Sequence, residues 1–168
     1  TSSSNDCTSS QKKNGGKGSI AEQLVDNKVD VLIGGGYNRF AQKTDAGPSV
    51  IDYAQSAHKY RTVTTKGELA AVQSLADGPV LGLFASENMT PRYQPLVAQP
   101  GGVGGADTTC SLADRGNQPS LAEMTAKAIE LLDNDKGFFL QAESAMIDKQ
   151  EHASDICGSI GDVYEIDQ

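Results

Sequence analysis

The chain has 168 residues, an apolar content of 38% and a formal net charge of −8. Its length suits one domain or part of a larger one, and no stretch approaches the roughly 20 apolar residues that a membrane helix needs. Basic residues are scattered and number 14 against 22 acidic ones, which argues against nucleic acid as a partner, since such binding depends on clustered basic side chains.

The first part of the chain predicts a polar start followed by a helix and a strand. Residues 1–18 are mostly Ser, Asn, Gly and Lys, too poor in apolar side chains to pack, so we expect a flexible N-terminal segment there. Ser19 and Glu22 have the spacing of a capping box, which predicts the start of a short helix. The apolar run at residues 29–36 then predicts a buried strand that ends in a tight turn at its glycines.

The middle of the chain alternates helical and strand patterns. Helices are predicted around residues 50–58 and 66–75, and the run PVLGLFA at residues 79–85 predicts a second buried strand. Strands that are separated by helices pair in parallel and are covered by helices on both faces. We therefore expect an α/β fold.

A long loop and a clear helix follow. Residues 88–116 are dominated by Pro, Gly, Thr and Asp, which indicates a loop excursion that carries Cys110. Ser120 and Glu123 form a second capping box, ahead of apolar residues at helical spacing. The run GFFLQAE at residues 137–143 then predicts a third apolar strand.

Three side chains near the end of this predicted strand have the spacing of metal ligands. Glu143 closes the strand, where open α/β sheets place their ligands. Asp148 and His152 are four residues apart, so a helical turn would put both on one face, as two ligands of one ion require. A carboxylate with an imidazole suits Zn²⁺, and a separate hard carboxylate such as Glu143 suits Mg²⁺.

The same residues also have a purely structural interpretation. Asp148 and His152 can form a surface ion pair within one helix, and Glu143 can be a carboxylate stabilised at a helix N-terminus. The pattern E-x4-D-x3-H is short and has many accidental matches, so spacing alone leaves both interpretations open. The second histidine, His58, has no carboxylate at ligand spacing and is expected to have a core or surface role.

A family resemblance favours the metal interpretation. The run GFFLQAESAMIDKQEHASDICGSIG, residues 137–161, is similar to the metal-ligand segment of the bacterial alkaline phosphatases. The similarity extends from Gly15 to Asp167 and includes GLFASENMTPRY and PSLAEMTAKAIELLDNDKGFFLQ. It implies an alkaline-phosphatase-like α/β sandwich with a mainly parallel central sheet flanked by helices.

The resemblance implies a role for each candidate ligand. Glu143 occupies the position of a Mg²⁺ ligand. Asp148 and His152 occupy positions that bind one of two Zn²⁺ ions, and Lys149 falls where the family places a lysine that holds phosphate through water.

The resemblance also accounts for the odd number of cysteines and implies the setting of the parent enzyme. Cys110 and Cys157 fall at the positions of a disulfide, whereas Cys7 lacks the upstream cysteine with which the family pairs it and is expected to be unpaired. The family further implies a homodimer that is periplasmic or secreted. It implies hydrolysis of phosphate monoesters through a phosphoserine intermediate.

The motifs that would complete such an active site are not in this sequence. The family's D-S-A nucleophile motif does not occur, nor do the later D-H and H motifs of the zinc sites, and the clamping arginine is expected upstream of Thr1. We therefore expect no catalytic residue here, incomplete metal sites, and no turnover by the isolated chain. A polar start and a helical pattern at the other end predict an internal fragment, in which residues 19–168 form part of the α/β domain. The alternative is a non-enzymatic folded fragment that binds divalent metal ions weakly through a half-site and its acidic surface.

Overall fold

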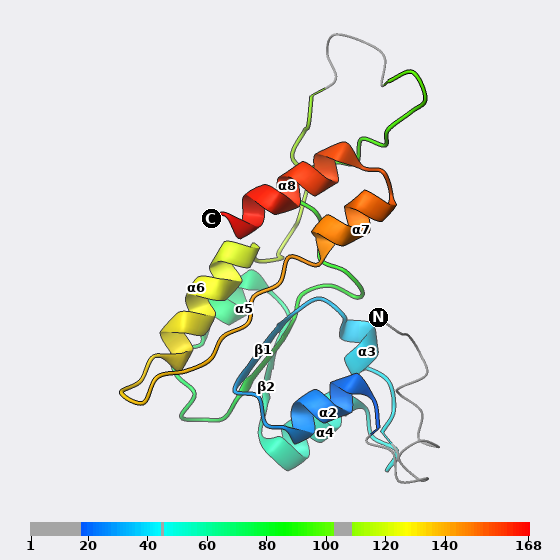
Figure 1. The fold of residues 1–168 in the computed structure, drawn as a ribbon. Helices are drawn as coiled ribbons and strands as arrows, with labels where there is room; N and C mark the ends of the chain where they lie inside the picture. The colour runs from blue at the N-terminus through cyan, green and yellow to red at the C-terminus, as the bar shows by residue number, and fades with distance from the viewer. Residues whose placement is uncertain (1–17, 45, 103–108) are drawn as a thin grey trace.

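A three-stranded parallel sheet forms the centre of the protein. The computed structural model describes residues 18–44, 46–102 and 109–168. Its strands are β1 (Val31–Gly34), β2 (Arg61–Val63) and β3 (Val80–Leu83), in the order β1-β3-β2 (Figure 1). The first residues of β1 and β2 both pair with the first residue of β3. The predicted α/β fold is confirmed.

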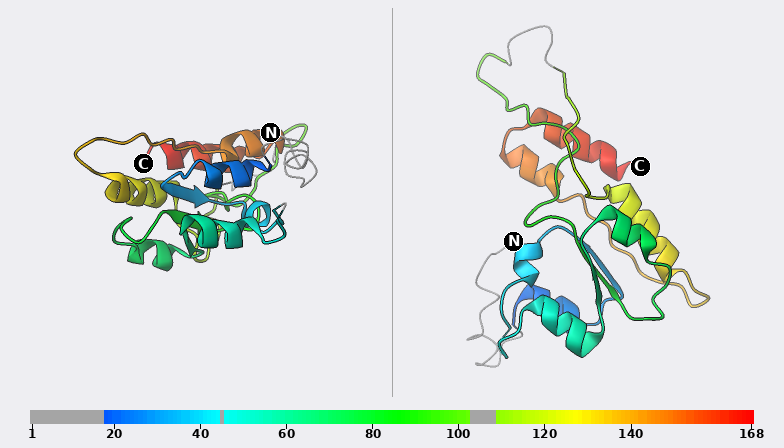
Figure 2. Two further views of the ribbon diagram at one scale, coloured as in Figure 1. Left: turned by 90° about the horizontal axis from the view of Figure 1, so that it is seen from below. Right: turned by 180° about the vertical axis from the view of Figure 1, so that it is seen from behind.

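Helices cover both faces of the sheet (Figures 1 and 2). One face carries α2 (Ile20–Asp26), α3 (Tyr37–Phe40) and α4 (Val50–His58). The other face carries α5 (Lys66–Ala71) and α6 (Leu121–Leu132). Among the described residues, none of the helices has the length and apolar character of a membrane-spanning helix.

Alternate residues of β3 divide between the two hydrophobic cores. Leu81 and Leu83 pack with the group that includes α2 and α4, and Val80 packs with α5 and α6. Each fully buried Leu or Val side chain stabilises the fold by about 1.5–3 kcal/mol relative to leaving it exposed. Because β3 is buried on both faces, its sequence is a continuous apolar run and does not alternate with polar residues.

Four of the described helices begin with a capping box. In each, the N-cap side chain and the acidic side chain three positions later bond each other's backbone N–H. These capping boxes are Ser19–Glu22, Ser49–Asp52, Thr65–Glu68 and Ser120–Glu123. The helix starts predicted at Ser19 and Ser120 are therefore confirmed.

One predicted strand was wrong, and one strand was not predicted. Residues 137–143 form neither helix nor strand, and the Phe139 side chain is 87% exposed. A strand needs a neighbouring strand to complete its backbone hydrogen bonds. Among the described residues, no strand pairs with residues 137–143, and β1 pairs only with β3. β2 was missed because three residues are too few to show a strand period.

The last two helices lie at one end of the molecule. α7 (Met146–His152) and α8 (Ile156–Ile166) pack against each other, next to residues 88–102 and 109–116, which are called the excursion below. In Figure 1 the helices lie in front of the excursion, and in the rear view of Figure 2 the excursion lies in front of the helices. A disulfide joins Cys110 in the excursion to Cys157 in α8, 47 residues later. Closing a loop of this length in the unfolded chain stabilises the fold by about 4 kcal/mol.

Candidate metal site

α7 places two of the predicted metal ligands side by side. Asp148 lies in its first turn and His152 in its last, and His152 Nε2 is 3.5 Å from Asp148 Oδ1. The side chains are exposed, His152 at 82% and Asp148 at 77%. The position of Asp148 also suits the helix dipole, which favours a carboxylate near the N-terminus. The pair is open to an ion from solvent.

The turn between α7 and α8 ties the ligand helix to the excursion. Asp155, three residues after His152, is buried and is the N-cap of α8, where its Oδ1 accepts the backbone N–H of Gly158 at 3.0 Å. The same oxygen accepts the backbone N–H of Leu96 in the excursion at 2.7 Å. Ser154 adopts a left-handed φ of 55° in this turn. The buried carboxylate of Asp155 therefore joins the start of α8 to the excursion. The backbone N–H of the same residue bonds the carbonyl of Gln150 in α7 at 2.8 Å.

Glu143 and Lys149 are exposed, and neither belongs to a group of metal-binding side chains among the described residues. Glu143 lies in the segment that precedes α7, and its neighbour Ser144 donates its hydroxyl to the backbone carbonyl of Asp162 in α8 at 3.2 Å. Lys149 lies on α7. Among the described residues, no three His, Cys, Asp or Glu side chains are grouped closely enough to hold an ion. The structure thus brings the Asp–His pair together and leaves Glu143 apart.

A buried ionic cluster beneath α8 was not predicted. Glu165 pairs with two arginines of the excursion, Arg92 at 2.8 Å and Arg115 at 3.0 Å, and Asp162 lies 3.9 Å from Arg115. Burial acts to raise the pKa of Glu165, but the hydrogen bonds from both arginines outweigh it and hold that pKa below its usual value. For Asp162 burial prevails, and its pKa is raised. No spacing rule links these residues, because their contacts cross long stretches of sequence.

The remaining predicted residues lie outside this cluster. Cys7 falls outside the described residues. His58 in α4 has its Nε2 3.2 Å from the Tyr53 hydroxyl and 3.6 Å from Asp26 Oδ1 in α2. A carboxylate therefore does reach His58, but it comes from another helix, so sequence spacing could not reveal it. The contact joins α2 to α4 on one face of the sheet.

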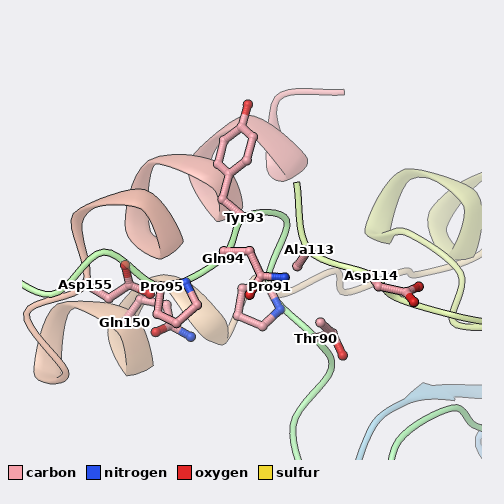
Figure 3. A pocket seen from close by; sticks show the side chains of 9 residues that line it. All are labelled: Thr90, Pro91, Tyr93, Gln94, Pro95, Ala113, Asp114, Gln150 and Asp155. Carbon is pink, nitrogen blue, oxygen red and sulfur yellow. The ribbon is translucent and has the colours of Figure 1, made fainter. Parts of the chain in front are cut away.

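A pocket of about 420 Å³ lies between the base of the excursion and the α7–α8 turn. Figure 3 shows the side chains that line it. Its walls include Gln150 and Asp155 but neither Asp148 nor His152. Residues two positions apart on an α-helix point in roughly opposite directions, so Gln150 faces away from the ligand pair. The pocket and the ligand pair therefore lie on different sides of α7.

Comparison with known proteins gives one family. The family model described as alkaline phosphatase matches residues 1–168. The alkaline phosphatase of Escherichia coli (strain K12) is 41% identical over 177 residues, which cover 100% of this chain and 37% of that protein. The streptomycin-6-phosphate phosphatase of Streptomyces griseus is 38% identical, over 96% of this chain and 38% of that protein.

A solved structure shows the same relationship in three dimensions. Thermus thermophilus alkaline phosphatase is similar with a TM-score of 0.62 and 29% identity, over 88% of this chain and 28% of that one. The chain spans less than two-fifths of the length of each relative named here. From the match over its whole length, the chain belongs to the alkaline phosphatase family.

Proposed function

We propose that this chain contributes part of the metal and phosphate site of an alkaline phosphatase that hydrolyses phosphate monoesters through a phosphoserine intermediate. The observation that carries the proposal is the Asp148–His152 pair, whose ligand atoms lie 3.5 Å apart on α7 in a chain of this family. The substrate class is supported by the Streptomyces griseus relative, which is named for streptomycin 6-phosphate, a phosphate monoester.

In this proposal Asp148 and His152 are two ligands of one Zn²⁺. Ligand atoms on bonds of about 2.0–2.2 Å at a tetrahedral angle lie about 3.3–3.6 Å apart, so the observed 3.5 Å fits. Bound zinc would act as a Lewis acid that stabilises negative charge on a phosphate oxygen. The contribution of α7 is to hold a neutral imidazole and an ionised carboxylate one helical turn apart.

Glu143 and Lys149 have separate proposed roles. A single exposed carboxylate such as Glu143 suits Mg²⁺, which takes one or two carboxylates and otherwise water. The hydrogen bond between Ser144 and the carbonyl of Asp162 limits the movement of the segment that carries Glu143. The ammonium group of Lys149 has three donors and a positive charge, so it can hold a water molecule against a phosphate group.

Residues outside this chain complete the site in this proposal. Zinc takes three or four protein ligands, and the Asp148–His152 pair supplies two. The serine nucleophile motif is not in the sequence either. We therefore propose that the isolated chain does not turn over. Its exposed pair favours a second function for the isolated chain, which is weak binding of divalent ions without catalysis.

The proposal places the protein in the periplasm or among secreted proteins. The disulfide between Cys110 and Cys157 supports this location, because disulfides persist in oxidising compartments. A homodimer is proposed from the family resemblance alone.

Calorimetric titration of the purified chain with Zn²⁺ tests the ligand assignment. We expect weak one-to-one binding that His152→Ala or Asp148→Asn reduces by roughly tenfold or more, since each leaves one ligand of two. His58→Ala is the matched control, because it removes the second histidine of the chain from another helix and should leave zinc binding unchanged. Equal zinc affinities for the wild-type and His152→Ala proteins would contradict the assignment.

A second measurement tests the reaction. The isolated chain should not hydrolyse p-nitrophenyl phosphate, whereas a polypeptide with the complete family sequence around this chain should do so, with activity lost in EDTA and restored by zinc. Metal-dependent hydrolysis by the isolated chain would mean that the site is already complete.

A further inference from the structure

Helix α8 exposes its apolar side and buries its polar side. Ile156, Ile160, Val163 and Ile166 are 43% to 57% exposed and follow one another at intervals of four, three and three residues. The buried residues of the same helix are Cys157, Gly158, Gly161, Asp162 and Glu165. A helix that packs on a hydrophobic core has the opposite arrangement. The four exposed residues are called the apolar face of α8 below.

The inner side of α8 is held by specific polar and covalent contacts. Glu165 receives hydrogen bonds from Arg92 and Arg115, and Cys157 is bonded to Cys110. At the start of the helix, the buried Asp155 side chain caps α8 and also binds the excursion. These contacts come from both ends of the helix, so α8 cannot roll without breaking several of them.

Close packing adds a steric limit to the same rotation. Gly161 lies against the Tyr93 ring, where an added Cβ would be 2.7 Å from Cδ2. A bulky isoleucine therefore cannot take the place of Gly161 against the excursion. The apolar face of α8 is therefore fixed in its outward direction by the excursion behind it, and its four side chains are exposed in the described part of the chain.

We propose that the apolar face of α8 is the docking surface for the part of the alkaline phosphatase polypeptide that lies outside this chain, which covers it with an apolar helix or sheet face. The Escherichia coli relative has 37% of its length in the matched region, so most of that polypeptide is available to cover this face. The inference rests on family membership and on the geometry of α8, and it does not depend on the proposed metal chemistry.

Two other occupants fit the surface less well. A membrane surface favours helices whose polar side carries Lys and Arg, whereas α8 has neither and its chain has a net charge of −8. A stable dimer of two copies buries about 800 Å² on each partner, which is more than four half-exposed side chains on an 11-residue helix offer. A larger polypeptide can dock here because its other contacts add to those of α8.

The test measures binding of the purified chain to the remaining part of the Escherichia coli alkaline phosphatase polypeptide, refolded together with it. Ile160→Glu places a charge in the centre of the apolar face and should weaken binding by roughly tenfold or more. Ile20→Glu on α2 is the matched control, because Ile20 is exposed to a similar extent, at 50% against 57% for Ile160, and it should bind as the wild type does. Val163→Thr, which is nearly isosteric, should weaken binding by a smaller factor, and circular dichroism verifies that each variant is folded.

Several results would overturn the proposal. Equal binding by Ile160→Glu and Ile20→Glu, or no binding by the wild type, would show that α8 is not the docking surface. Self-association that Ile160→Glu abolishes would assign the face to a second copy, and partition into phosphatidylcholine–phosphatidylglycerol vesicles would assign it to a membrane. Because none of these measurements uses zinc or phosphatase activity, their failure is distinct from a failure of the proposed function.

Discussion

Arg92 and Glu165 are 73 residues apart in the sequence, and their side chains meet at 2.8 Å beneath α8. Arg115 reaches the other oxygen of the same carboxylate at 3.0 Å, so Glu165 holds both ends of the excursion together. The Arg92 guanidinium also lies 4.3 Å from the centre of the Tyr164 ring, a cation–π contact. Glu165 is thus the main polar contact between α8 and the excursion.

Replacing Glu165 with Gln should lower the free energy of unfolding by about 2–4 kcal/mol. The amide carries no charge, so the partly buried Arg92 loses its counter-charge and Arg115 keeps only the more distant Asp162 at 3.9 Å. Urea denaturation at neutral pH measures the change. Glu87→Gln is the control, since Glu87 forms an exposed pair with Arg39 at 3.6 Å, and its loss should cost less than about 1 kcal/mol. Equal effects would show that the buried cluster contributes no more than a surface pair.

Because the pKa of Glu165 is lowered, we expect the stability of the protein to depend on pH in the acid range. Since the folded-state pKa of Glu165 lies below its ordinary value of 4.5, its stabilising contribution is present above that value and is lost as the pH falls through the folded pKa. The difference in unfolding free energy between wild type and Glu165→Gln should therefore shrink as the pH is lowered below 4.5. A difference that stays constant with pH would mean that the Glu165 pKa is not lowered.

Because the pKa of Tyr60 is raised, we expect the protein to lose stability at alkaline pH. Burial, and then the nearby carboxylate of Asp30, raise the pKa of Tyr60 from 10.0 to about 12, and its hydroxyl donates to the Val29 carbonyl at 2.7 Å. The unfolded chain releases this proton at lower pH than the folded one. The contribution of Tyr60 to stability is therefore fully present below pH 10. As the pH rises to 12, the free energy of unfolding falls by roughly 2–3 kcal/mol.

Tyr60→Phe removes the ionisable group and should flatten this alkaline loss. The variant should also lose about 1 kcal/mol at neutral pH with its hydrogen bond to the Val29 carbonyl. Tyr37→Phe, at an exposed tyrosine, should keep the wild-type profile. Denaturation across the alkaline range measures both, and an unchanged slope in Tyr60→Phe would assign the loss to other groups.

The helix starts, and the placement of Asp148 and His152 on one face of a helix, depend on residues close together in the sequence. The capping box of Ser120 and Glu123 spans three residues, and the Asp148–His152 pair spans one helical turn, so the local backbone alone brings these groups together. The Arg92–Glu165 pair depends on how the whole chain packs, and no periodicity records it. Strand pairing has the same dependence, which is why the apolar run at residues 137–143 was mistaken for a strand.

The turn between α7 and α8 is tightly packed around Gly158. A Cβ at this position would overlap Asp155 Oδ2 and lie 2.6 Å from Gln150 Cγ on α7. Gly158→Ala should therefore lower the free energy of unfolding by about 1–3 kcal/mol. Because the displaced side chain belongs to the helix that carries Asp148 and His152, the variant should also bind Zn²⁺ more weakly.

The control for Gly158→Ala is Gly67→Ala in α5, where an added Cβ meets nothing within 4 Å. Alanine is the better helix former, so this change should leave stability unaltered or raise it by up to about 1 kcal/mol. Urea denaturation compares the two variants, and calorimetric titration compares their zinc affinities. If both unfold at the same urea concentration, the α7–α8 turn has room for a methyl group. If only the stability of Gly158→Ala falls and its zinc affinity does not, the turn supports the fold without positioning the ligand pair.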